Sequence, residues 1–209
     1  MTAVRPLHPA RLRESPSPAW GEGRIAGVDE AGRGPWAGPV VAAAVVLDRA
    51  DFPAGLDDSK KLSAAARERL FAALQTSARI GVGMASVAEI DALNIHWATM
   101  LAMERAVDAL GCAVDHVLVD GNRLPKWRHS ATTIVGGDAL CAAISAASII
   151  AKVTRDRLMA GLDAEYPGYG WARNKGYGTA VHARGLAELG VSDHHRRSFA
   201  PVRARLASV

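Results

Sequence analysis

The chain has 209 residues, 49% of them hydrophobic and 22% charged, with a formal net charge of +4. This length and composition predict one globular domain with at most a small addition, and they exclude a chain too polar to bury a core. No apolar run is long enough to span a bilayer, which excludes a protein anchored by membrane-spanning helices.

The first twenty residues lack the apolar core of a secretory signal, and the two cysteines, Cys112 and Cys141, have no spacing typical of a metal site. Both cysteines are interpreted as small core residues in a reducing compartment. We therefore expect a cytoplasmic protein that does not act at a membrane.

The charge is distributed unevenly along the chain. Residues 25–170 carry 14 basic and 17 acidic side chains, whereas residues 171–209 carry seven basic and two acidic ones. A mildly acidic body with a basic C-terminal region is compatible with a polyanion held over a metal centre. It is equally compatible with a basic terminus that only improves solubility.

The N-terminal part begins with a segment that we expect to be flexible. Residues 1–23 contain four prolines and a mixture of polar residues. Apolar runs then predict two strands, over residues 24–30 and 40–47, with a turn rich in glycine and proline over 32–39. A polar loop follows over residues 48–61.

Two helices and a third strand come next. The first helix is expected over residues 63–77, and the strand over residues 79–85. A capping box over residues 86–89 opens a second helical stretch, which extends to Leu110 and is interrupted near Asn94.

The C-terminal half alternates strands with helices. Short strands are predicted over residues 115–120 and 131–135, and a long alanine-rich helix over 140–162. A glycine-rich aromatic loop over residues 166–179 precedes a last helix that ends near Leu189. Three consecutive strands followed by alternating elements predict an α/β fold with a mixed sheet, in which parallel strands extend an antiparallel meander.

Four acidic residues lie where predicted strands end. Asp29 and Glu30 follow an apolar run directly, Asp120 ends the fourth strand, and Asp138 follows the fifth. Ligands bind beyond the carboxyl ends of strands in open α/β sheets, so these carboxylates are expected to converge on one or two oxygen-ligated ions, Mg²⁺ or Mn²⁺. Two objections stay open. The later acids could be turn or helix-cap residues, and neighbours in a regular strand face opposite sides.

Specific sequence blocks occur in order along the chain: GVDEAGRGP at 27–35, AGPVVAAAV at 37–45, DSKKLS at 58–63, LVDGN at 118–122, SAASIIAKVTRD at 145–156, NKGYGT at 174–179 and HRRSF at 195–199. With these blocks the chain resembles bacterial ribonuclease HII. The resemblance implies a ribonuclease H-like mixed five-stranded sheet flanked by helices, with a C-terminal helical extension. It divides the chain into a flexible segment 1–23, a catalytic core 24–165 and a substrate-binding helical region 166–209.

The resemblance also implies an activity. The family hydrolyses the RNA strand of RNA–DNA hybrids and incises 5′ to single ribonucleotides embedded in duplex DNA, leaving 5′-phosphate and 3′-hydroxyl ends. We therefore expect a two-metal site with Mn²⁺ or Mg²⁺ as cofactor. The expected partners are RNA–DNA hybrid duplexes and DNA that contains ribonucleotides, and the expected oligomeric state is a monomer.

Residue by residue, the resemblance assigns catalytic and metal-binding roles to four acids: Asp29, Glu30, Asp120 and Asp138. It assigns substrate-binding roles to Gly32, Arg33, Gly34, Lys60 and Tyr177. The glycine–arginine–glycine segment would sense the ribose 2′-hydroxyl at the RNA–DNA junction, the lysine would contact a phosphate, and the tyrosine would pack on the sugar of the following deoxynucleotide. The chain departs from the family at Gly136, where a lysine is common two residues before the fourth acid.

Several other polar residues have a structural interpretation beside a functional one. Arg196 and Arg197 either hold backbone phosphates or lie at the surface. His194 and His195 either fix the C-terminal segment or touch phosphate. Asp156 is interpreted as one partner of a structural ion pair on the long helix.

Two other functions stay open on the sequence. One is a metal-dependent exonuclease or transposase-like transferase on a related sheet. The other is a non-catalytic binder of hybrid duplexes. The four acids argue against a binder, because a protein that only binds gains nothing from carboxylates that face phosphate.

Overall fold

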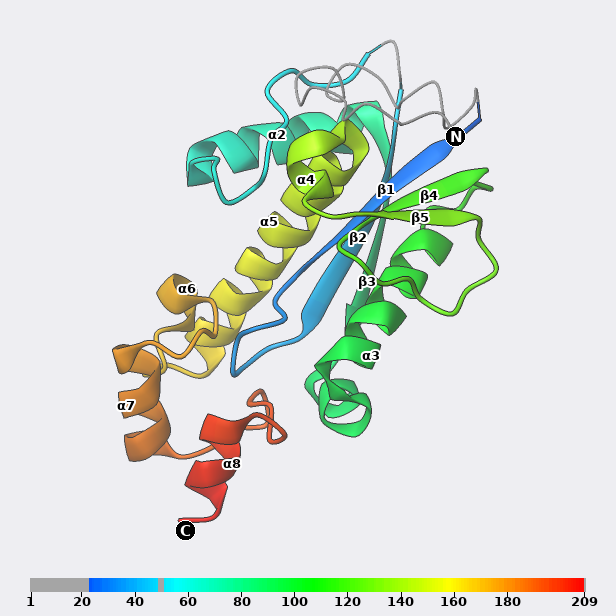
Figure 1. Ribbon diagram of the computed structural model, residues 1–209. Coiled ribbons are helices and arrows are strands. Elements are labelled where there is room, and N and C mark those ends of the chain that lie inside the picture. Colours follow the sequence, from blue (N-terminus) through cyan, green and yellow to red (C-terminus); the bar gives the residue numbers. More distant parts are fainter. Residues whose placement is uncertain (1–22, 49–50, 209) are drawn as a thin grey trace.

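The computed structural model describes residues 23–48 and 51–208, and its centre is a five-stranded sheet with the strand order β3-β2-β1-β4-β5 (Figure 1). The strands are β1 (Ile25–Ala31), β2 (Val40–Leu47), β3 (Ala78–Ala85), β4 (His116–Asp120) and β5 (Ala131–Ile134). The first three strands pair antiparallel, and β4 and β5 extend the sheet in parallel beside β1. The predicted α/β fold with a mixed five-stranded sheet is confirmed.

Helices cover both faces of this sheet. They are α2 (Ala64–Ser77), α3 (Val87–Asp108), α4 (Gly137–Leu140), α5 (Ala142–Glu165), α6 (Trp171–Asn174), α7 (Ala180–Leu189) and α8 (Ala200–Leu206). Figure 1 shows α3 on one face of the sheet and α5 on the other, with α2 beside α5. Helices α6, α7 and α8 gather near the C-terminal end of α5. Among the helices described, none is both long and apolar enough to cross a bilayer.

The alternation of side chains along β2 divides the core into two layers. Val40 and Ala42 pack in one buried cluster with Ala98 of α3, while Ala43 packs in a second cluster with Ile150 of α5. Both faces of the strand are therefore apolar, as expected for a strand covered on both sides. The predicted buried strand over residues 40–47 is confirmed.

Helix α5 approaches β1 very closely at Gly27. A Cβ atom at this position would lie 2.2 Å from the carbonyl carbon of Ala143, so only glycine fits between the strand and the helix. The close approach brings the start of α5 against the strand that carries the first two acids. This contact between Gly27 and the start of α5 packs the helix against β1 two residues before Asp29.

Several predicted helix boundaries are confirmed. The Ser86 hydroxyl accepts from the N–H of Glu89, and the Glu89 carboxylate accepts from the N–H of Ser86, which completes the capping box of α3. The expected interruption of this helix lies at Asn94, whose φ is 67°. Its side chain accepts from the N–H groups of His96 and Trp97 and so begins the second half of α3.

The C-terminal half differs from the prediction in three places. The single helix expected over residues 140–162 is divided by Cys141, where the extended backbone (φ −129°) separates α4 from α5. The loop expected over 166–179 contains the short helix α6, and α8 forms where no individual helix was predicted. Elements of four to seven residues are too short to show a helical period in sequence. The expectation for residues 1–23 concerns, except for Gly23, residues outside the described ranges.

Candidate active site

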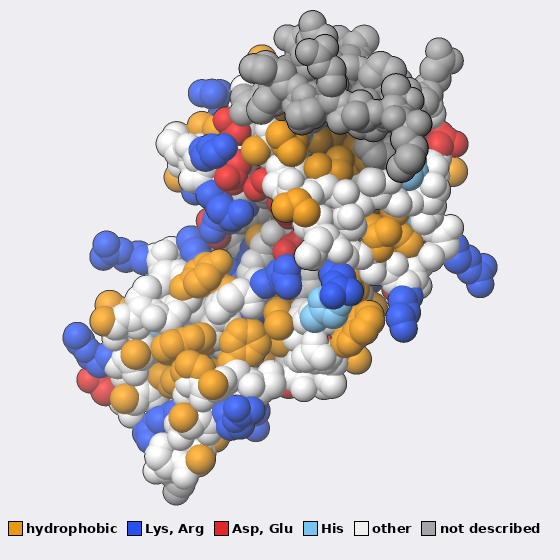
Figure 2. All heavy atoms as spheres, viewed as in Figure 1, with side chains coloured by type: hydrophobic (Ala, Val, Ile, Leu, Met, Phe, Trp, Pro, Cys, Tyr) orange, Lys and Arg blue, Asp and Glu red, His pale blue; other side chains and the backbone are white. Residues whose placement is uncertain are grey.

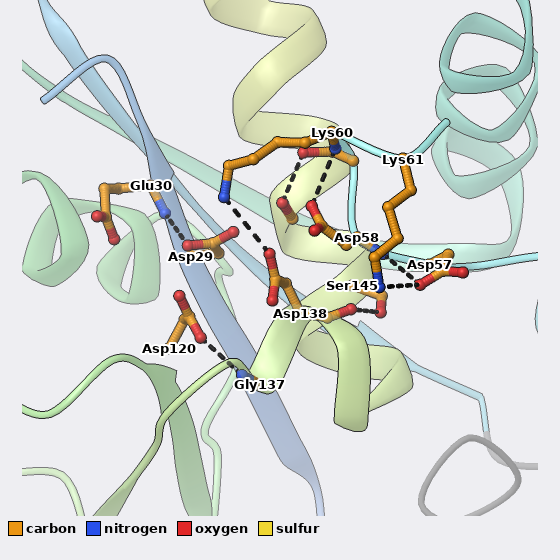
Figure 3. Close-up of polar contacts among 12 residues, drawn as sticks. Asp29, Glu30, Asp57, Asp58, Lys60, Lys61, Asp120, Gly137, Asp138 and Ser145 are labelled. Carbon is orange, nitrogen blue, oxygen red and sulfur yellow. Dashed lines mark hydrogen bonds and ion pairs between the residues drawn. The ribbon is translucent and has the colours of Figure 1, made fainter. Parts of the chain in front are cut away.

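The four predicted acids are brought to one place at the carboxyl ends of the parallel strands. Figure 3 shows Asp29 between Glu30 and Asp120 on one side and Asp138 on the other. Asp29 and Glu30 leave β1 on opposite sides, because the strand stays regular up to Ala31. Asp120 is the last residue of β4, and Asp138 lies in the first turn of α4.

Hydrogen bonds hold the buried acids in place. The hydroxyls of Ser59 and Ser148 lie 2.9 Å apart, and Ser148 lines the same cavity as Asp29, where its hydroxyl opposes the rise in the pKa of that carboxyl group. Asp29 is only 5% exposed, and its Oδ1 also accepts the N–H of Glu30 at 2.7 Å. The hydroxyl of Ser145 donates to the backbone carbonyl of Asp138 and so ties α4 to α5.

The backbone before the fourth acid depends on glycine. Gly136 has a φ of 67°, in the left-handed region that favours glycine over other residues. The next residue, Gly137, donates its N–H to Oδ1 of Asp120 at 2.7 Å. The position that departs from the family pattern therefore forms a glycine turn that joins β5 to α4 in this chain.

Negative charge accumulates at this site. Burial raises the pKa of Asp29 well above its usual value, and the neighbouring charges of Glu30 and Asp120 raise it further. Burial also raises the pKa of Glu30, although the guanidinium of Arg33 opposes the shift. Burial, followed by the charge of Asp120, raises the pKa of Asp138. Carboxylates that resist ionisation in this way suit a hard divalent cation, because its charge would offset both burial and mutual repulsion.

The four acidic side chains do not form a compact metal-binding group in this structure. In the described part of the chain, no three or more His, Cys, Asp or Glu side chains form a ready metal-binding group. Two basic side chains partly offset the negative charge of the acids. Lys60 Nζ lies 3.7 Å from Oδ2 of Asp138, and Arg33 lies 3.3 Å from Oε1 of Glu30.

A cavity of about 310 Å³ joins two of the four acids to the predicted substrate-binding residues, whereas Asp120 and Asp138 are not among the residues that line it. Asp29, Glu30, Lys60 and Tyr177 line it together with the segment Gly32–Gly34. Figure 2 shows acidic side chains in a hollow on this face, with Lys and Arg side chains around it. A basic rim over an acidic floor is the charge pattern expected for a phosphodiester held over a metal site.

The same cavity contains residues that sequence reasoning did not single out: Ser59, Ser148, Lys152 and Arg155. Lys152 forms an ion pair of 2.6 Å with Asp156, which confirms the structural interpretation of that acid. Ser59, Ser148 and Lys152 lie inside recognisable sequence blocks. For Ser148 and Lys152, the helical spacing to Asp156 on α5 is the sequence signal that could have placed them. Only the fold brings Ser59 next to Ser148.

Two buried arginines hold the loop that contains Gly32–Gly34. Arg196 is fully buried and donates to the carbonyls of Gly32 (2.5 Å), Arg33 (2.9 Å) and Gly38 (2.9 Å). Arg155, 1% exposed, donates to the carbonyls of Pro39, Ala37 and Lys175. Both interpretations of Arg196, a phosphate contact and a surface residue, are therefore wrong. All three of its nitrogens are used inside the protein.

Tyr177 stands beside this loop. Its side chain is 48% exposed, and a Cβ atom at Gly34 would lie 3.4 Å from its ring. The loop that carries it is fixed by a hydrogen bond of 2.8 Å from the N–H of Trp36 to the carbonyl of Gly176. The predicted 2′-hydroxyl sensor and the predicted sugar-packing tyrosine are thus neighbours.

A buried histidine pair supports the tyrosine loop from below. His182 Nδ1 lies 3.0 Å from the carbonyl of Tyr177 and donates to it, so Nε2 accepts from the indole N–H of Trp171 and from His195 Nε2. His195 then accepts from the N–H of Ser192 through Nδ1. The structural interpretation of His195 is confirmed, and a contact with phosphate is excluded by its complete burial.

A larger cavity of about 990 Å³ lies elsewhere, between α5 and the start of α3. Its walls include Phe71, Met84 and Leu158 and contain none of the predicted site residues. The larger cavity and the acids therefore lie at different places, and we take the acids as the candidate active site because their chemistry suits a divalent cation.

Comparison with known proteins agrees with this geometry. The family described as Ribonuclease HII matches residues 26–202. Ribonuclease HII of Rhizorhabdus wittichii is 64% identical over 178 residues, which cover 85% of this chain and 88% of that protein. The crystal structure of ribonuclease H2 from Pyrococcus horikoshii OT3 matches with a TM-score of 0.74 and 29% identity, over 88% of this chain and 98% of that one. Bst ribonuclease HIII, solved in complex with Mn²⁺, matches with a TM-score of 0.73 over 96% of this chain and 72% of that one. At 19% identity, it shows a likeness of fold alone.

Proposed function

Because the chain belongs to the ribonuclease HII family of metal-dependent endoribonucleases, which cleave RNA in RNA–DNA hybrids, we propose that it also incises duplex DNA 5′ to a single embedded ribonucleotide. The cut leaves 5′-phosphate and 3′-hydroxyl ends. The observation that carries the proposal is one cavity in which carboxylates and the backbone of Gly32–Gly34 lie together. One phosphodiester can then be cut while the ribose beside it is recognised.

The acids hold two divalent cations in this proposal. Asp29, central among the four, would contribute to both metal sites, and Glu30, Asp120 and Asp138 would complete them. Oxygen donors without histidine or cysteine favour Mg²⁺ or Mn²⁺. When bound, the two cations activate the attacking water and offset the charge that develops on the departing 3′-oxygen. The raised pKa of Asp29, caused first by burial, supports the need for such a positive charge.

Recognition of the ribose relies on backbone rather than on side chains. A 2′-hydroxyl is what distinguishes RNA from DNA, and glycines allow the main chain to approach it closely. Gly32–Gly34 make this contact, and the ring of Tyr177 packs on the sugar of the deoxynucleotide that follows. The position of this ring beside Gly34 supports the assignment, because the two recognition elements would contact adjacent sugars.

Lys60 binds a substrate phosphate in this proposal. Its side chain is 80% exposed and reaches over the acids from the loop before α2. The contact with Asp138 is long enough, at 3.7 Å, to be exchanged for a phosphate oxygen at little cost. The substrates are RNA–DNA hybrids and DNA that contains ribonucleotides. The monomeric state and the cytoplasmic location stay predictions.

A covalently closed DNA circle with one ribonucleotide, incubated with Mg²⁺ or Mn²⁺, tests the proposal against both rivals. We expect a single nick 5′ to the ribonucleotide with the wild type and none with Asp29→Asn. An exonuclease leaves the circle intact because it needs an end. A non-catalytic binder leaves both the circle and a long hybrid uncut, and binds hybrid equally well in EDTA. Cleavage of long hybrids without nicking of the circle would refute recognition of the RNA–DNA junction but not the ribonuclease activity on hybrids.

A further inference from the structure

Arg196 contacts the loop of residues 32–38, which we call the recognition loop, through every nitrogen of its side chain. Its Nε, NH1 and NH2 groups each donate to a different carbonyl between residues 32 and 38. Its own backbone N–H donates to the carbonyl of Trp36 at 2.8 Å. Its neighbour His195 forms an antiparallel bridge with Ala37. One short C-terminal segment therefore determines the path of the whole loop.

The contacts also fix the orientation of two peptide planes. In a planar trans peptide, the carbonyl of one residue and the N–H of the next point in opposite directions. Because Arg196 draws the carbonyls of Gly32 and Arg33 toward itself, the N–H groups of Arg33 and Gly34 point away from the buried guanidinium. Both residues line the cavity that contains Asp29. Within residues 23–48 and 51–208, neither of these N–H groups donates to a protein acceptor.

A second buried arginine, Arg155, also holds this loop, through hydrogen bonds to the carbonyls of Ala37 and Pro39. Gly32 has a φ of 95°, and a Cβ atom there would lie 1.9 Å from Nε of Arg155. Gly32 thus packs against Arg155, and its carbonyl accepts from Arg196. Burial, followed by the charge of Arg155, lowers the pKa of Arg196 to about 9. A buried cation whose partners are carbonyls rather than carboxylates is a costly way to hold a loop, and its benefit is geometric.

We propose that Arg196 is a positioning residue that directs the backbone N–H groups of Arg33 and Gly34 toward the ribose 2′-oxygen at the RNA–DNA junction. The inference rests on the proposed function, because it explains how the recognition loop of that site is aimed. Arg196 itself does not touch the substrate. The planar fork of its guanidinium serves three carbonyls at once, which a lysine ammonium on a flexible stem does not reproduce.

The test measures how much the 2′-hydroxyl contributes to binding. Two duplexes are compared, one with a single ribonucleotide and one entirely deoxy, and their Kd values are measured by fluorescence anisotropy with Mg²⁺. All proteins carry Asp29→Asn to prevent cleavage. The measured ratio is the Kd of the all-deoxy duplex divided by the Kd of the ribonucleotide duplex. We expect this ratio to fall about tenfold in Arg196→Lys, as the loss of one or two well-aligned hydrogen bonds predicts. Arg197→Lys is the matched control, because Arg197 is exposed and contacts Asp193, and its ratio should equal that of the parent protein.

The outcomes separate the two proposals. If the parent protein binds both duplexes equally, junction recognition itself fails. If the parent protein discriminates and folded Arg196→Lys keeps the same ratio with weaker binding to both duplexes, Arg196 is merely structural and the inference is overturned. If Arg196→Lys does not fold, hydrogen exchange in the parent protein decides. Protection of the Arg33 and Gly34 amides by the ribonucleotide duplex alone supports the inference, and equal or absent protection by both duplexes contradicts it.

Discussion

Asp120 accepts a hydrogen bond of 2.7 Å from the backbone N–H of Gly137, so one acid of the site positions the turn that carries the next. The carboxylate therefore has two separable properties. Its oxygen fixes the start of α4, and its charge acts on Asp29, whose pKa is raised first by burial and then by the neighbouring acids.

Asp120→Asn is predicted to separate these properties. An asparagine keeps an oxygen that can accept from Gly137 but loses the charge. We expect a folded protein with a thermal midpoint equal to or above that of the wild type in EDTA, because repulsion at the site decreases. Nicking of the ribonucleotide substrate should fall at least about a thousandfold, as is typical when an essential electrostatic group is removed. Asp108→Asn, at an exposed position on α3, is the control and should leave both quantities unchanged. A clear loss of stability in Asp120→Asn would show that the hydrogen bond requires the carboxylate.

Lys60 and Lys61 allow a matched test of phosphate binding. Lys60 lines the cavity with the acids, whereas Lys61 lies 3.9 Å from Asp57 and does not. We expect Lys60→Gln to reduce kcat/KM about tenfold or more, because a charge-assisted contact with phosphate is lost, and Lys61→Gln to change it less than about twofold. Steady-state kinetics at two salt concentrations measure this. Equal effects of both substitutions would indicate a general attraction of DNA instead of a specific contact.

Alanine substitutions at the two glycines of the recognition loop are predicted to have different effects. Gly32→Ala requires a φ of 95° and a Cβ 1.9 Å from Arg155, so it should reduce the free energy of unfolding by about 2–4 kcal/mol. Gly34→Ala places its Cβ 3.4 Å from the ring of Tyr177 and should cost less than about 1 kcal/mol. Its effect should instead be a weaker preference for the ribonucleotide over the deoxy duplex. Urea unfolding and the Kd ratio together measure both variants. A stable Gly32→Ala protein would contradict the described path of the loop.

Acid is predicted to destabilise the protein through the histidine pair. Burial, followed by the charge of His182, lowers the pKa of His195 to about 4, whereas an unfolded histidine titrates near about 6.5. Between these values the unfolded chain binds a proton that the native one does not. The free energy of unfolding therefore falls as pH decreases from about 6.5 to about 4, by up to about 1.4 kcal/mol per pH unit for this group. Burial also lowers the pKa of His182, which adds a contribution of the same sign.

Urea unfolding in EDTA at several pH values between 7 and 5 measures this dependence. His195→Asn should unfold with a smaller pH dependence, because the titrating group is gone while Asn can still accept from Ser192. His96→Asn, at a histidine outside the buried pair, should keep the wild-type dependence. Identical dependences in the wild type and His195→Asn would assign the acid sensitivity to other groups.

Much of the fold is predictable from local patterns. The apolar run before Asp29, the capping box at Ser86 and the interruption at Asn94 are each determined by neighbours in sequence, and the structure contains all three. The same holds for the strand that ends at Asp120. Motifs of this kind placed Asp29, Glu30 and Asp120 on the correct strands, whereas Asp138, expected at the end of the fifth strand, lies in the first turn of α4.

The supporting residues are not predictable in the same way. Arg196 has the sequence context of a surface arginine, and nothing near it in the chain reveals that its partners are carbonyls more than 150 residues away. Ser59 and Ser148 are likewise 89 positions apart. Residues of this type are determined by the packing of distant segments, so they become visible only when the loop, α5 and the C-terminal segment are placed together.

Helix α5 serves both halves of the site. Ser148 lines the cavity together with Asp29, and Arg155, seven residues later on the same side of the helix, holds the recognition loop. Two helical turns have a nearly fixed length of about 10 Å. A helical segment of constant length therefore separates the proposed catalytic acids from the proposed ribose-binding loop, so the spacing between these two parts of the site does not depend on a flexible loop. An insertion of one residue between Ser148 and Arg155 would rotate one of these side chains by about 100° around the helix relative to the other. Ser148 and Arg155 could then no longer face the acids and the recognition loop at the same time.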